Sequence, residues 1–203
     1  MPEVKPKRGR PASVDKDAAM QIMVELFRSK GFAAVSLDDL SSATGLSRPS
    51  LYRAFGNKVS MYISAIDAFG AQVGQEAMPD LFATESLQAD IANFLSAMLT
   101  IYYRDHEVMP GCLVFATAPS AAEEAAIQQR LEFSIKQTDA FIRSRIAKGA
   151  PNASDTQIQT AVEIASNTLI AFSARAKSGS TKSELEQMGA RSAHAIVVLL
   201  GVV

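Results

Sequence analysis

The chain has 203 residues, of which 48% are hydrophobic and 20% charged, so it is composed like a folded protein with one large or two small domains rather than a disordered one. One cysteine excludes an internal disulfide, and the apolar run at 195–200 is much shorter than the roughly 20 residues that span a bilayer. No secretory signal opens the chain, so we expect a cytoplasmic protein.

Charge is distributed unevenly along the chain. The net charge is −1, but residues 1–60 carry ten Lys and Arg against six Asp and Glu, whereas residues 61–203 carry ten against fifteen. Such a division indicates two parts with different tasks, and it makes the basic N-terminal part the candidate for binding an anionic partner.

Hydrophobic periodicity predicts an all-α fold, because apolar residues recur every three or four positions and no segment alternates with a period of two. Ser36, Ser154 and Thr181 each precede an acid or glutamine by three residues, which is the spacing of a capping box. The expected helices are 17–30, 37–44, 47–55, 58–74, 87–102, 120–149, 154–177 and 182–203.

The helices at 37–44 and 47–55 are joined by a tight turn that contains Gly45. If Ser47 is the N-cap, Pro49 falls in the first helical turn, where a missing N–H removes no intrahelical hydrogen bond. Two such helices form either a helix-turn-helix or an ordinary αα-hairpin. The preceding helix at 17–30 supplies apolar side chains to cover both, which favours the helix-turn-helix.

Polar side chains remain on the outer face of the second short helix. Ser47, Arg48 and Ser50 stand at its start, and Lys58 begins the next helix directly after Asn57, a capping residue type. A cation beside the free N–H groups of a helix start forms an anion site. This arrangement suits a helix that enters a DNA groove with phosphates on either side.

The stretch from Asp15 to Ile66, with its segments ELFRSKGF, SLDDLSSATGLS and LYRAFGNK, resembles the TetR family of bacterial transcriptional regulators. The resemblance implies a basic arm at 1–14, a three-helix DNA-binding domain at 15–60 and a helical ligand-binding and dimerisation domain at 61–203. It implies a homodimeric repressor that a small hydrophobic molecule releases from double-stranded operator DNA. The alternative is a ligand-binding or interaction protein that has lost specific operator binding.

The resemblance and the residue chemistry together suggest the DNA contacts. Base edges would be read by Ser47, Arg48 and Ser50, and phosphates held by Ser36, Tyr52 and Lys58. Arg8 and Arg10 lie in RGRP, which looks like the core of an AT-hook that follows a narrow minor groove. The other interpretation of this segment is a disordered, solubilising tail.

Aromatic and sulfur-containing residues at helical spacing are the candidates for a ligand cavity, although plain core packing explains the same pattern. The candidates are Phe94, Met98, Tyr102, Cys112, Phe115, Phe133 and Phe172. Cys112 follows Pro110-Gly111 at a predicted helix start, where its thiol is either reactive through a lowered pKa or inert. No nucleophile, phosphate loop or metal-ligand set stands out, so we expect neither an enzyme nor a cofactor or metal.

The last two helices carry broad apolar faces, and by resemblance to the family they would pair with a second copy of the chain in a four-helix bundle. The residues assigned to this interface are Leu169, Leu185, Met188, Ser192, Ile196 and Leu199.

Overall fold

A computed structural model describes residues 15–104, 111–117 and 124–202. Within these ranges all regular structure is helical, so the expected all-α class is confirmed. The elements are α1 (Lys16–Ala34), α2 (Leu37–Thr44), α3 (Arg48–Phe55), α4 (Lys58–Glu76), the 3-10 helix η1 (Met78–Phe82), α5 (Leu87–Tyr102), α6 (Leu113–Thr117), α7 (Ala125–Gly149), α8 (Asp155–Lys177) and α9 (Lys182–Leu200).

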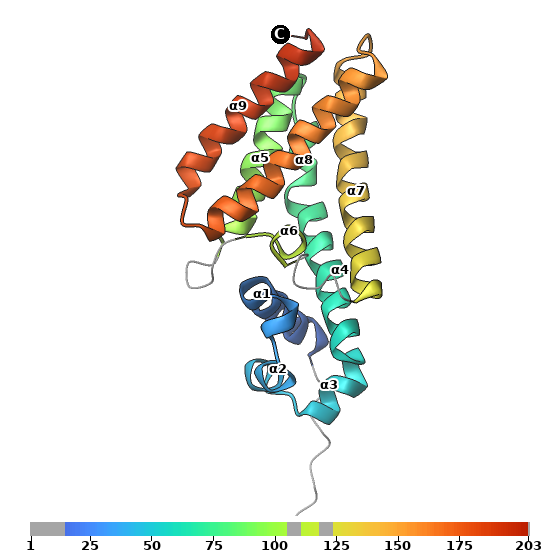
Figure 1. Cartoon of the computed structure of the whole chain (residues 1–203), viewed down its shortest axis with the longest axis vertical. Helices are drawn as coiled ribbons and strands as arrows, with labels where there is room; N and C mark the ends of the chain where they lie inside the picture. Colours follow the sequence, from blue (N-terminus) through green and yellow to red (C-terminus); the bar gives the residue numbers. More distant parts are fainter. Residues whose placement is uncertain (1–14, 105–110, 118–123, 203) are drawn as a thin grey trace, which may run out of the picture.

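The molecule is elongated, with α1, α2 and α3 at one end and α5, α7, α8 and α9 at the other (Figure 1). The long helix α4 begins beside α3 and runs into the larger group of helices, so it joins the two ends (Figure 1). None of the helices in the described ranges is both long and apolar enough to cross a membrane.

Short-range hydrogen bonds determine where the small helices begin. Ser36 and Asp39 form the expected capping box, and Ser47 caps α3 by accepting from the Ser50 N–H, with Pro49 in the first turn. Between the two helices Gly45 adopts φ 68°, a left-handed conformation that suits glycine. The helix-turn-helix geometry therefore follows from residues that are neighbours in the sequence.

The three small helices share a buried core of Met23, Phe27, Leu40 and Leu51. This core continues into α4 through Tyr62, whose ring meets Phe27 edge-on at 5.0 Å between ring centroids. The backbone of α1 leaves helical geometry at Gly31 (φ 79°), where the first helix was expected to end, and a further short helical turn continues to Ala34.

An ion pair between α5 and α7 lies inside the larger group of helices. Asp90 and Arg145 are 0% and 4% exposed, and the Arg145 Nε donates to the Asp90 carboxylate at 2.7 Å. Desolvation raises the pKa of Asp90, but hydrogen bonds from Thr84 and Arg145 outweigh it, so the net shift is downward. The pair fastens α5 to α7 at the end remote from α1.

The short element η1 was not predicted, because five residues are too few to show a helical period. The helix start expected at Cys112 is that of the five-residue helix α6. The predicted start of the long helix at 120–123 lies outside the described residues, which resume at Glu124, the residue before α7. The capping boxes expected at Ser154 and Thr181 are both present.

Candidate DNA interface and ligand cavity

The start of α3 presents polar side chains to solvent while its other face is buried. Ser47 and Arg48 are exposed and Ser50 is half-buried, whereas Leu51 is fully buried in the core of the small helices. The Ser47 and Ser50 hydroxyl oxygens lie 3.0 Å apart and can exchange hydrogen bonds. Hydroxyl and guanidinium groups at the first turn of an exposed helix can donate to, or accept from, base edges in a major groove.

Arg48 is held on the surface by a neighbouring carboxylate. Its Nε donates to Asp38 Oδ1 at 2.8 Å, and the Asp38 side chain, on α2, is 72% exposed. An ion pair this exposed contributes little to stability, so the guanidinium can leave it for an acceptor on another molecule. This partner was not predicted from the sequence, although Asp38 lies in the segment SLDDLSSATGLS.

A second cationic site follows α3, at the start of α4. Asn57 caps α4 by accepting from the Ser60 N–H at 2.8 Å, as expected. The Lys58 Nζ lies 4.5 Å from the centroid of the Phe32 ring, and partial burial lowers the pKa of this lysine. The lysine is therefore positioned by an aromatic face beside the free N–H groups of a helix start.

The other predicted DNA contacts have different surroundings. Tyr52 is 48% exposed on α3, so its ring and hydroxyl are available. Ser36 is exposed, but its hydroxyl donates to Asp39 at 2.5 Å within the capping box, and the hydrogen bond from Ser36 lowers the pKa of Asp39. Arg8 and Arg10 lie outside the described residues.

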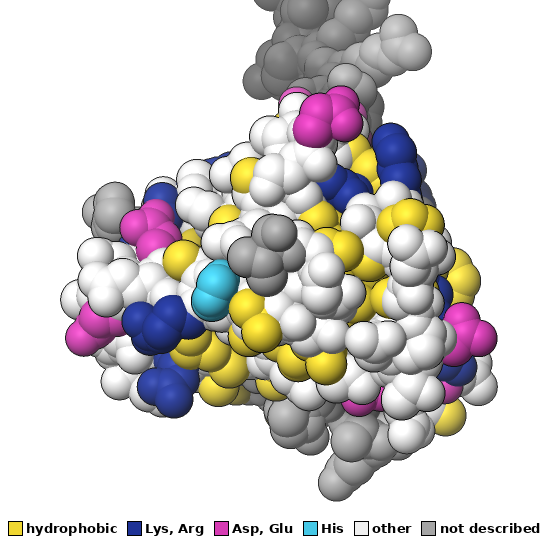
Figure 2. Space-filling model, turned by 90° about the horizontal axis from the view of Figure 1, so that it is seen from above, with side chains coloured by type: hydrophobic (Ala, Val, Ile, Leu, Met, Phe, Trp, Pro, Cys, Tyr) yellow, Lys and Arg dark blue, Asp and Glu magenta, His cyan; other side chains and the backbone are white. Residues whose placement is uncertain are grey.

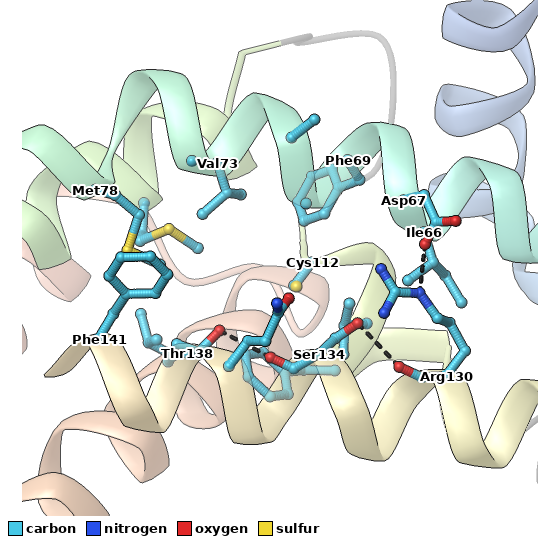
Figure 3. Close-up of a pocket in the computed structure, with 18 residues that line it drawn as sticks. Ile66, Asp67, Phe69, Val73, Met78, Cys112, Arg130, Ser134, Thr138 and Phe141 are labelled. Carbon is cyan, nitrogen blue, oxygen red and sulfur yellow. Dashed lines mark hydrogen bonds and ion pairs between the residues drawn. The ribbon is translucent and has the colours of Figure 1, made fainter. Parts of the chain in front are cut away.

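A cavity of about 280 Å³ lies in the larger group of helices, between α4 and α7 (Figure 3). Most of its lining is apolar. Gly70 and Gly74 of α4 lie in the wall, and a Cβ added at either would meet no atom within 4 Å. The residues that line it are Ile66, Asp67, Phe69, Gly70, Ala71, Val73, Gly74, Met78, Met98, Cys112, Val114, Phe115, Arg130, Ser134, Gln137, Thr138, Phe141 and Leu169.

The charged and hydroxyl-bearing side chains in the cavity wall are paired within the protein. Asp67 on α4 forms an ion pair with Arg130 on α7, and these are the two ionised side chains of the lining (Figure 3). Ser134 and Thr138 donate their hydroxyl protons to carbonyls of their own helix, at 3.0 and 3.1 Å. The wall therefore offers an uncharged molecule apolar contact and hydroxyl acceptors, and it offers no unpaired charge to an ionised one.

Three of the seven predicted ligand residues line this cavity, namely Met98, Cys112 and Phe115. The structure corrects the other four. Phe94, Tyr102 and Phe172 are fully buried core residues that lie outside the lining. Phe133 is 49% exposed, with the Arg130 guanidinium 4.8 Å from its ring centroid.

Helical spacing shows that a residue is buried but not whether it faces a helix or a cavity, so the contribution of α4 to the wall was not predicted from the sequence. The α7 residues Ser134, Gln137 and Thr138 were not predicted either. The glycines at 70 and 74, one helical turn apart within α4, are the one signal in the sequence that could have indicated open space there.

Cys112 precedes the five-residue helix α6 and is 2% exposed. Burial raises the pKa of its thiol, although backbone and Tyr102 hydrogen bonds act in the opposite direction. A reactive thiol requires a lowered pKa, so the structure supports the inert alternative. Its backbone N–H donates to Ser173 Oγ at 3.0 Å, which ties the segment before α6 to α8.

The residues assigned to dimerisation divide into two groups. Leu169, Leu185 and Ile196 are at most 2% exposed in the single chain, so they pack in its own core and do not form a free surface. This is a correction, since a broad apolar face on a helix can cover its own domain. Met188, Ser192 and Leu199 are half-buried, and the Ser192 hydroxyl accepts from Thr168 at 3.0 Å.

The outer surfaces of α8 and α9 still carry apolar side chains. Val198 on α9 is 54% exposed and Ile170 on α8 is 43% exposed. Hydrophobic side chains also gather on the end of the molecule where α9 finishes, as the view from above shows (Figure 2). Large exposed apolar side chains on two adjacent helices are typical of a surface that meets another protein.

A sequence profile described as "Bacterial regulatory proteins, tetR family" matches residues 23–65, the segment from α1 into α4. The HTH-type transcriptional repressor ComR of Escherichia coli K12 is 27% identical over 152 residues, which cover 72% of each chain. BdcR, an HTH-type transcriptional repressor of the same organism, is 25% identical over 197 residues that cover 95% of this chain and 94% of BdcR.

Among solved structures, the TetR family transcriptional regulator CifR, as a cysteine mutant complexed with 26-base-pair double-strand operator DNA, superposes with a TM-score of 0.81. That match is 25% identical and covers 92% of this chain and 99% of CifR.

Proposed function

Since this chain belongs to the TetR family of bacterial regulatory proteins, we propose that it is a DNA-binding transcriptional regulator of the bacterial cytoplasm. It acts as a homodimeric repressor that a small, uncharged, hydrophobic molecule releases from double-stranded operator DNA. The observation that carries this proposal is the exposed polar start of α3, a helix whose other face is buried.

Base reading falls to the first turn of α3. Arg48 is the side chain there with a planar fork of donors, and such a fork matches the O6 and N7 acceptors of guanine. On binding, it exchanges the Asp38 carboxylate for the base, and exchange of one exposed partner for another is inexpensive. Ser47 and Ser50 supply shorter hydrogen-bonding groups beside it.

Phosphate binding falls to the groups on either side of that turn. Lys58 and the free N–H groups at the start of α4 form one anion site, and Tyr52 supplies a hydroxyl on α3. Such contacts orient a helix in the groove and give most of the affinity, but they carry no sequence information.

Control by a ligand requires a physical connection between the cavity and the DNA contacts, and α4 supplies one. It starts at the phosphate anchor Lys58 and forms a wall of the cavity with residues from Ile66 to Gly74. A molecule that fits the cavity best when α4 is tilted favours that state, and the tilt moves the two recognition helices of a dimer away from their DNA spacing. A coupling of about 1–3 kcal/mol is typical of such effects.

The experiment compares three arginine or lysine variants on specific and non-specific DNA. Arg48→Ala lowers discrimination at one base position, by about 1–3 kcal/mol. Lys58→Ala weakens binding to all sequences and reduces the slope of log K against log salt by about one unit. Arg53→Ala, an exposed arginine in the last turn of α3, is the matched control for loss of one positive charge.

If Arg48→Ala and Arg53→Ala behave identically on every base substitution, α3 does not read sequence through Arg48. If the wild-type protein binds all DNA with equal affinity, the chain is instead the ligand-binding protein without operator specificity.

A further inference from the structure

Arg28 is among the largest fully buried side chains in the described part of the molecule, with an exposed fraction of 2%. It lies on α1, which belongs with α2 and α3 to the DNA-binding unit. Its guanidinium nevertheless points into the larger group of helices, which we call the ligand-binding unit. Charged side chains are rarely this buried unless each donor has a partner. The partners therefore show what this arginine does.

The guanidinium bonds to the end of α5, which is 73 or more residues away in the sequence. Nη1 donates to the carbonyl oxygens of Ile101 at 3.0 Å and Tyr102 at 3.4 Å, and Nε and Nη2 donate to Glu25 Oε2 at 3.0 and 2.6 Å. The C-terminal carbonyls of a helix carry partial negative charge, so a cation there is stabilised by the helix as well as by Glu25.

The same site is linked to the cavity on its other side. The Tyr102 hydroxyl is buried close to the Cys112 thiol, and Cys112 lines the cavity. The Lys177 ammonium of α8 donates to the Arg28 carbonyl at 3.4 Å, which adds a second bond from the larger unit to α1. The end of α5 thus touches the cavity wall through Tyr102 and the DNA-binding unit through Arg28.

We propose that Arg28 is a positioning residue that fixes the orientation of the DNA-binding unit on the ligand-binding unit by holding the end of α5. The inference rests on the proposed function for its consequence on DNA, but the joint itself is a property of the free protein. The exposed ion pair of Arg104, two residues after α5, with Glu76 at the end of α4 is too accessible to water to fix the orientation of the two units alone.

The consequence on DNA is a strict half-site spacing. A dimer reads two half-sites only when its recognition helices stand about one DNA turn, roughly 34–36 Å, or a multiple of it, apart. A rigid joint therefore penalises an operator whose half-sites are moved by one base pair, and a loose joint tolerates it. Arg28→Met removes the donors and keeps most of the apolar stem.

The test measures the affinity of the full-length protein for its selected operator and for the same operator with one base pair inserted at the centre. Arg28→Met is expected to reduce the ratio of the two affinities by about tenfold, which corresponds to the loss of a hydrogen bond from a charged group. Arg28→Lys retains the charge but loses the fork, and is expected to fall between. Met23→Ala, a core variant on the same helix that donates no bond to α5, controls for general destabilisation and should keep the wild-type ratio.

A second measurement needs no DNA. Spin labels at Arg53→Cys on α3 and Lys148→Cys on α7 report the distance between the two units, in labelled protein diluted with unlabelled protein; both positions are exposed. Arg28→Met is expected to broaden this distance distribution, and Met23→Ala is not. Equal widths in wild type and Arg28→Met overturn the inference whatever the protein does with DNA. Broadening without sequence-specific DNA binding supports the joint and contradicts the proposed function.

Discussion

At the starts of α2 and α3 the charged side chains of Asp38 and Arg48 are exposed, whereas between α5 and α7 the ion pair of Asp90 and Arg145 is buried. The exposed groups leave a surface that can exchange water for DNA at small cost. The buried pair is fixed, because separating it would leave a charge in an apolar interior. The end formed by α1, α2 and α3 thus carries exchangeable surface ion pairs over a small buried core. The end formed by α5, α7, α8 and α9 is held together by a buried ion pair and borders the cavity.

On α9 the contrast between exposed and buried positions can be tested directly, because Ile196 was assigned to the dimer surface but lies in the core. Ile196→Asp is expected to prevent folding, because a carboxylate at a position 0% exposed costs more than about 4–5 kcal/mol. Val198→Asp, two residues along the same helix and 54% exposed, should leave the fold intact and weaken the proposed dimer. Circular dichroism and sedimentation distinguish the two outcomes, and a dimeric, folded Ile196→Asp protein would contradict the assignment of this face.

Removal of one partner of the buried pair should have the next largest effect. Asp90→Ala is expected to lower the free energy of unfolding by about 3–5 kcal/mol, since Arg145 is left buried without its carboxylate. Glu132→Ala breaks the exposed pair with Lys136 on the surface of α7 and should cost no more than about 0.5 kcal/mol. Urea unfolding measures the free energy of unfolding of both variants. Similar losses in the two would contradict the distinction between the buried and the exposed ion pair.

The Asp90 carboxylate also makes the stability depend on pH. Its pKa is lowered in the folded protein from the ordinary value of 3.8, so its contribution is present above about pH 4 and declines as the pH falls below that value. Asp90→Asn should flatten this part of the profile of unfolding free energy against pH. If the free energy of unfolding of Asp90→Asn still falls with pH below about pH 4 as in the wild type, other carboxylates cause that fall.

The smallest expected effect concerns the cavity wall. An added Cβ at Gly70 meets no atom within 4 Å, so Gly70→Ala should raise the free energy of unfolding by about 0.5–1 kcal/mol through the better helix propensity of alanine. Gly70→Leu should fold equally well but occupy the cavity and weaken binding of 2-naphthol, a small uncharged aromatic probe, by about tenfold. Fluorescence titration measures it, and equal affinity in all three proteins would place the probe elsewhere.

Sequence reasoning succeeded where structure depends on near neighbours. The caps at Ser36, Ser47 and Asn57 and the glycine turn at Gly45 were predicted from spacing alone, because each hydrogen bond closes within three residues. Hydrophobic periodicity predicted the helices of the remainder, and the resemblance to the TetR family supplied their expected roles in ligand binding and dimerisation.

The cavity was predicted poorly because it is a tertiary feature. Phe94 and Phe172 have the same helical spacing as the residues that line the cavity, but they are buried in the core. The space lies beside Phe69 on α4 and Phe141 on α7 because of how these two helices pack, and helical spacing does not show this. The Arg28 joint was missed for a similar reason. Its partners on α5 are backbone carbonyls, which leave no mark in a side-chain pattern.

Selection of binding sites from a random double-stranded DNA library by the full-length protein tests the central claim most directly. The account predicts enrichment of an inverted repeat, with half-site centres about one helical turn apart or a multiple of it, and loss of preference at one position of each half-site in Arg48→Ala. Enrichment of no sequence by the wild-type protein, or of the same sequence by Arg48→Ala with undiminished preference at every position, would contradict it.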